Sequence, residues 1–184
     1  MKLFAALLLC FLVRIPASGQ VCLGFGQDGK CNGLSLDGVS NGTRETNGLN
    51  LSAISESSSY NGLSIGLFAI LRGTTNGLAF GLVADPEKAN GVILGCFVGG
   101  LGYVGPTAGL TNTISGLSVG ATTSAGALNG VAISMLTDVK KQRGVTIGGL
   151  NVTDELHGLQ IGMLDYAGNN PLWLRYLPLL NIQF

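Results

Sequence analysis

The chain has 184 residues, of which 30 are glycine and only 11% are charged, with ten basic and ten acidic side chains. This length suits a single domain, and the balanced charge without a basic cluster excludes a nucleic-acid-binding protein. Beyond the N-terminus, no apolar run approaches the ~18 residues that a membrane-spanning helix needs.

The N-terminus reads as an export signal. Lys2 precedes an apolar run over residues 3–13, and the small residue Gly19 suits cleavage by signal peptidase. The sequence therefore predicts a signal peptide over residues 1–19 and one mature all-β repeat domain over residues 20–184.

The mature chain keeps three cysteines. Export would permit a disulfide between Cys22 and Cys31 across a small glycine-rich loop, and a reduced pair is the equal alternative. Lipidation of Cys22 would need a small residue in the place of Val21. Cys96 lies at an apolar position of its repeat and is expected to act as a small hydrophobe. Three cysteines and one histidine without ligand spacing do not predict a zinc site.

A tripeptide, Asn-Gly-Leu or a close variant, recurs along the chain from residue 32 to residue 159. Its glycines are spaced by 14 or 15 residues, apart from one step of 25. A fixed period predicts stacked copies of one small unit. The glycines are Gly33, Gly48, Gly62, Gly77, Gly91, Gly116, Gly130, Gly144 and Gly158.

Within each copy, apolar residues occupy every second position, which is the period of a β-strand. In one copy Leu63, Ile65 and Leu67 share a face, and the small residues Ser64 and Gly66 share the other. We expect the apolar face to meet lipid or a core. An aspartate at position 65 should then be far more harmful than one at position 64.

The period suits two architectures of about ten short strands. An antiparallel meander closing into a barrel is favoured, because polar stretches such as 84–89 read as turns and are too polar to line a solenoid core. The alternative is a parallel β-solenoid with one coil per repeat, in which the Asn residues would stack into ladders.

No constellation of catalytic, cofactor-binding or metal-ligating residues is found. His157 replaces the turn Asn of other copies, and Asp154 with Glu155 reads as a solvated turn rather than an acid/base pair. We therefore expect a non-enzymatic protein without cofactors.

Apolar residues alternate along the C-terminus to a terminal phenylalanine. This segment, with Tyr176, Leu180, Ile182 and Phe184, resembles the assembly signal of bacterial outer-membrane barrels.

Residues 158–172 and 177–184 together resemble a repeat family of bacteria with two membranes, whose units read like GLQIGLLNYA and whose tail reads like NNPL…LPLLNFHF. These are signal-bearing surface repeat proteins of unassigned activity. The resemblance implies an outer-membrane or cell-surface location and carries over no catalytic residue. The favoured barrel would make the chain a structural or weakly pore-forming protein in outer-membrane lipid. The alternative is an extracellular β-solenoid that binds an unknown surface ligand. The oligomeric state stays open.

Overall fold

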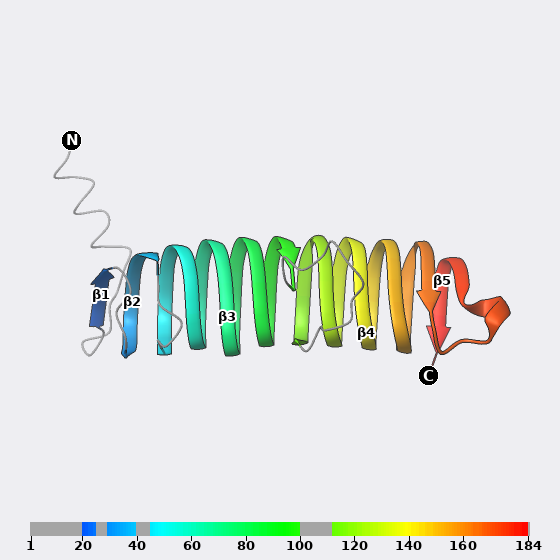
Figure 1. Cartoon of the computed structure of the whole chain (residues 1–184), viewed down its shortest axis with the longest axis horizontal. Coiled ribbons are helices and arrows are strands. Elements are labelled where there is room, and N and C mark those ends of the chain that lie inside the picture. The colour runs from blue at the N-terminus through cyan, green and yellow to red at the C-terminus, as the bar shows by residue number, and fades with distance from the viewer. Residues whose placement is uncertain (1–19, 25–28, 40–44, 100–111, 184) are drawn as a thin grey trace.

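The computed structural model describes residues 20–24, 29–39, 45–99 and 112–183, which form a parallel β-solenoid (Figure 1). Successive coils stack along one axis, from β1 (Gln20–Gly24) and β2 (Lys30–Val39) to β3 (Glu45–Val98) and β4 (Thr113–Ala167). A short 3₁₀ helix, η1 (Leu172–Leu174), and β5 (Tyr176–Gln183) close the C-terminal end. Among the described residues, no helix is both long and apolar enough to cross a membrane.

The strand register corrects the favoured architecture. The β1–β2, β2–β3 and β3–β4 pairs are parallel, and among the described pairs only β4–β5 is antiparallel. Gly33 pairs with Gly48, and Gly91 pairs with Gly116 across the 25-residue step. The all-β repeat prediction is confirmed, but the antiparallel meander or barrel is wrong. Each repeat is one coil of a solenoid, because residues one period apart are ladder partners.

The repeated glycines form a single column, and the backbone there requires glycine. All nine have φ between 129° and 147°, which L side chains rarely adopt. A Cβ atom on Gly77 would also collide with the carbonyl oxygen of Gly62 in the preceding coil. Close approach of neighbouring coils therefore combines with backbone conformation to exclude any other residue.

The strands run on through the segments that the sequence suggests are turns. β3 and β4 continue without interruption over 54 and 55 residues. Ser55 and Ser57, which belong to such a polar stretch, are buried inside the coil. The coil closes because the continuous strand bends at its corners, so no separate return segment is needed.

The two faces of each repeat are the reverse of what we expected. Ser64 is fully buried, whereas Ile65 is 40% exposed and Leu67 is 59% exposed. Along this part of the coil the small side chain faces the interior and the large apolar side chains on either side of it point outward.

The interior changes character along the stack. A cluster of buried apolar residues extends from Tyr60 to Val139, and the Tyr60 hydroxyl donates a hydrogen bond to the Gly48 carbonyl at 2.8 Å. Nearer the C-terminus the buried residues are largely polar. They include Gln142, Thr146, Asn151, Thr153, Gln160 and Asp165, each at 0% exposure.

Both ends of the stack carry additional links. At the N-terminal end a disulfide joins Cys22 to Cys31, with 6.4 Å between their Cα atoms. At the C-terminal end the Asn170 side-chain amide donates to Asn181 Oδ1 at 2.7 Å, which ties the turn after β4 to β5.

Candidate interaction surface

The most distinctive surface is an exposed apolar strip along the stack. Sixteen large apolar side chains, 36–80% exposed, lie three, five or six residues after a column glycine. Because neighbouring coils are in register, equivalent side chains form rows along the axis. The sixteen are Val39, Leu51, Ile54, Ile65, Leu67, Phe68, Phe80, Leu82, Phe97, Ile133, Met135, Leu136, Ile147, Ile161, Met163 and Leu164.

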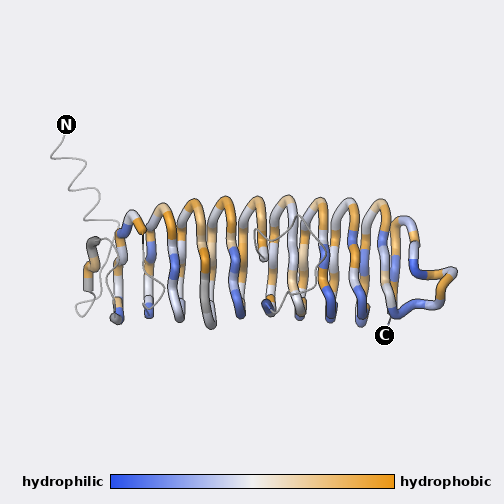
Figure 2. Tube along the Cα trace, in the orientation of Figure 1, coloured by the Kyte–Doolittle hydropathy of each residue, from blue (hydrophilic) through white to orange (hydrophobic). Residues whose placement is uncertain are grey.

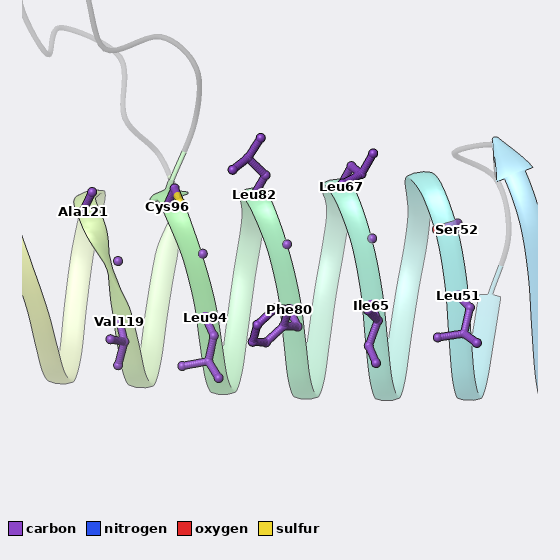
Figure 3. A pocket seen from close by; sticks show the side chains of 14 residues that line it. Leu51, Ser52, Ile65, Leu67, Phe80, Leu82, Leu94, Cys96, Val119 and Ala121 are labelled. Atoms are coloured by element: carbon purple, nitrogen blue, oxygen red, sulfur yellow. The ribbon is translucent and has the colours of Figure 1, made fainter.

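A groove of about 770 Å³ runs along this strip (Figure 3). One side, the wall row, consists of the residues three positions after each glycine, and the other side, the ridge row, of those five positions after. The lining residues of the wall row are Leu51, Ile65, Phe80, Leu94 and Val119, and those of the ridge row are Leu67, Leu82, Cys96 and Ala121.

The groove floor is made of the residues between the two rows, which are Ser52, Gly66, Gly81, Gly95 and Gly120. A Cβ on Gly95 would lie 2.7 Å from the Gly81 carbonyl oxygen, so the packing of adjacent coils demands this small residue. The groove is therefore a direct consequence of coil stacking, and it is rigid because its floor is backbone.

Exposed charged residues lie on the other side of the coils. Lys88 and Lys141 follow their column glycines by eleven residues, and Lys141 makes a 3.1 Å ion pair with Glu155 of the next coil. Figure 2 shows the same division, with hydrophobic residues along one side of the stack and hydrophilic residues along the opposite side. Each coil is thus amphipathic in cross-section.

A ladder of asparagine side chains precedes the glycine column in the N-terminal half. The amide of Asn47 donates to Asn32 Oδ1 at 2.8 Å, and Asn61 donates to Asn47 at 2.7 Å. The same pattern continues through Asn76 to Asn90. His157 occupies this column near the C-terminal end and is exposed. Its place is that of a substituted ladder residue.

The remaining residues singled out in the sequence are spread over the molecule. Cys22 and Cys31 are disulfide-bonded at the first coils, and Cys96 is a free, exposed thiol in the ridge row. Tyr176, Leu180 and Ile182 lie in β5 with exposures of 65%, 51% and 49%, and Phe184 lies outside the described residues.

One buried acid stands out among the titratable groups. Asn151 donates to Asp165 Oδ1 at 2.7 Å, and Asp165 Oδ2 has no hydrogen-bond partner. Burial raises the pKa of the Asp165 carboxyl, although the bonds from Asn151 and Gly162 oppose this. Within the described ranges, no three His, Cys, Asp or Glu residues lie close enough to hold a metal ion.

The groove was missed at the sequence level because alternation defines two faces without saying which is inside. A signal was present in the small residues: a face made largely of Ser, Ala, Gly and Thr in most copies fits a narrow interior better than an exposed surface. Comparisons with protein-family models, with curated proteins and with solved structures gave no match. The surface must therefore be interpreted from its own geometry.

Proposed function

We propose that the chain is an exported, non-enzymatic structural and binding protein of the bacterial cell surface. It acts through the apolar strip of a rigid β-solenoid. This corresponds to the alternative that the sequence left open, an extracellular β-solenoid that binds a surface ligand. A pore has less support, because buried side chains fill the interior of the coils rather than leaving a lumen.

The observation that carries the proposal is the continuity of the strip. Monomeric soluble proteins rarely expose an apolar patch beyond ~300–600 Å², and larger patches mark interaction sites. Here the wall-row position is apolar in every described coil from Ile65 to Ile161, on one side of the molecule, and most of these side chains are exposed. A partner would remove these side chains from water, and that burial is the main driving force for association.

Location rests on the sequence. Residues 1–19 have the features of a signal peptide, and the C-terminal units resemble those of bacterial surface repeat proteins. A disulfide between Cys22 and Cys31 suits an oxidising compartment outside the cytoplasm.

The test follows the protein in a bacterium with two membranes. Intact mass should show loss of residues 1–19, and native electrophoresis of envelope extracts should show the chain in a complex. A variant with serine at Leu67, Phe80, Leu82 and Met135 should be exported but run free of the complex.

A matched variant carries serine at Lys88, Asn129, Arg143 and Asp154, which are exposed on or near the polar side. It should keep the complex. Retention of the complete chain in the cytoplasm would overturn the proposal, as would equal complex formation by both variants.

A further inference from the structure

The groove and the ridge beside it have matching shapes. The ridge row projects as Leu67, Leu82 and Cys96, and the floor beside it is Gly66, Gly81 and Gly95 (Figure 3). A row of projecting side chains and a parallel row of recesses thus lie next to each other on one surface.

Both rows have the spacing of the coils, because each coil contributes one residue to each row. Adjacent coils lie ~4.8 Å apart, the separation of hydrogen-bonded strands. A partner that fills every recess must carry apolar groups at this same spacing. A second copy of this chain satisfies the condition automatically, since its own ridge row has an identical repeat.

We propose that the apolar strip binds a second copy of the chain in a two-fold dimer, in which the ridge row of each copy lies in the groove of the other. This rests on the proposed function, whose partner it identifies. In a two-fold interface the same patch faces itself, so a ridge beside a groove is self-complementary.

The area of the strip is sufficient for a stable dimer. If each half-exposed side chain offers roughly 60 Å² of apolar surface, the sixteen offer roughly 1,000 Å². A stable interface buries ~800 Å² on each partner.

The charges also favour a protein partner over a lipid surface. Surfaces that bind membranes commonly place Lys and Arg around the apolar strip. Here Lys88, Lys140 and Lys141 follow their column glycines by ten or eleven residues, on the opposite side of the coil. Without residues 1–19 the chain has eight basic and ten acidic side chains, so no long-range attraction to anionic lipid is expected.

The test measures the mass of the exported, purified chain in detergent-free buffer by sedimentation velocity over a range of concentrations. The dimer predicts twice the mass of one chain. Leu82→Lys should raise the dimer dissociation constant by about 100-fold or more, because it places a lysine from each copy in the apolar interface.

Asn129→Lys is the matched control. It adds the same charge in the column that Arg143 and His157 already occupy, outside the strip, and it should leave the dissociation constant unchanged. Because Leu82 is about half exposed, both variants should retain the circular dichroism spectrum of the parent.

Cys96 provides an internal reporter. In the single chain its thiol is free and exposed, and it lies in the ridge row. A maleimide should modify it slowly in the dimer and rapidly in the Leu82→Lys variant at the same concentration.

Two results would overturn the dimer. One is a detergent-free monomer whose Cys96 reacts rapidly at every concentration. The other is a monomer that floats with phosphatidylcholine vesicles, which would assign the strip to lipid. Either result leaves the proposed function standing if the serine variant still loses its envelope complex, and failure of export would overturn the proposed function alone.

Discussion

The middle coils and the C-terminal coils share one backbone around different interiors. Two residues after the column glycine, the middle coils place Ala79 and Ile93, and the C-terminal coils place Thr146 and Gln160. Seven residues after it, Val98 of the middle coils corresponds to Asp165. The glycine φ values are the same in both regions. The coil is therefore defined by its glycine column and by the backbone pairing of neighbouring coils, and either an apolar or a polar interior can fill it.

If this conclusion is right, the column glycine matters equally in both regions. Gly77→Ala and Gly144→Ala should each lower the free energy of unfolding by more than ~3 kcal/mol, because strained backbone adds to a collision with the preceding coil. Urea unfolding followed by circular dichroism measures it.

Gly29→Ala is the control for that pair. Its φ is +117° but no atom lies within 4 Å of the added Cβ, so backbone strain alone should cost about 1 kcal/mol. A much larger loss at Gly77 than at Gly144 would mean that the apolar interior, rather than the column, holds the coil.

The second prediction concerns which face of the repeat is buried. Ser64→Asp should cost several kcal/mol, because Ser64 is fully buried and the neutral Asn50 amide beside it cannot offset the charge of a carboxylate. Ile65→Asp should cost less than ~1 kcal/mol in the monomer, because Ile65 already meets solvent.

Soluble yield and urea midpoint of the two variants, under conditions that keep the chain monomeric, give the comparison. Equal destabilisation would contradict the observed orientation of the faces.

The polar interior should also respond to pH. Burial raises the pKa of Asp165 above its unfolded value of ~4, so the folded state holds the proton more tightly than the unfolded state. Below the unfolded pKa both states are protonated and no penalty exists. Stability then falls as pH rises through the folded pKa, and the penalty is complete above it.

Asp165→Asn should remove this part of the pH dependence and stabilise the chain at neutral pH. Urea midpoints from pH 3 to 8 measure the change, with Asp85→Asn as the comparison, since burial also raises the pKa of Asp85 in the middle coils. An unchanged pH slope in Asp165→Asn would show that its carboxyl titrates alike in both states.

The smallest effect is expected at the N-terminal end. Replacing Cys22 and Cys31 by serine together should loosen β1 and β2, with less than about 1 kcal/mol lost from the coils beyond, because each coil contacts only its neighbours.

Hydrogen exchange resolved by segment shows the difference. Faster exchange throughout β4 would reveal a cooperative unit longer than nearest-neighbour contacts allow.

The repeat period and the β-strand alternation could be predicted because they follow from residue order alone. All nine column glycines have positive φ, and six of them follow an asparagine, which is a common sequence signal for that conformation. Strand direction could not be predicted, because a 14-residue period is the same for a coil and for a strand with its turn.

The orientation of the faces failed for a different reason. Large apolar residues are usually inside, and the coil does enclose Tyr60 and Leu128 at other positions, but Phe80 and Leu82 lie outside and are 52% and 49% exposed. The polar stretch containing Ser55 and Ser57 has the composition of a turn, and the sequence does not show that these hydroxyls face inward. The groove depends on the strand direction and on the orientation of the faces. Neither follows from the sequence, so the groove could be recognised only in the structure.

The 25-residue step between Gly91 and Gly116 has a consequence for how such a chain changes length. These two glycines are ladder partners although eleven more residues separate them than in an ordinary step of 14. The number of coils is therefore set by the number of column glycines and not by the number of residues between them. Duplication of a 42-base-pair stretch of the gene would add one coil and extend the strip by ~4.8 Å, so the reach of the protein can be adjusted during evolution one unit at a time.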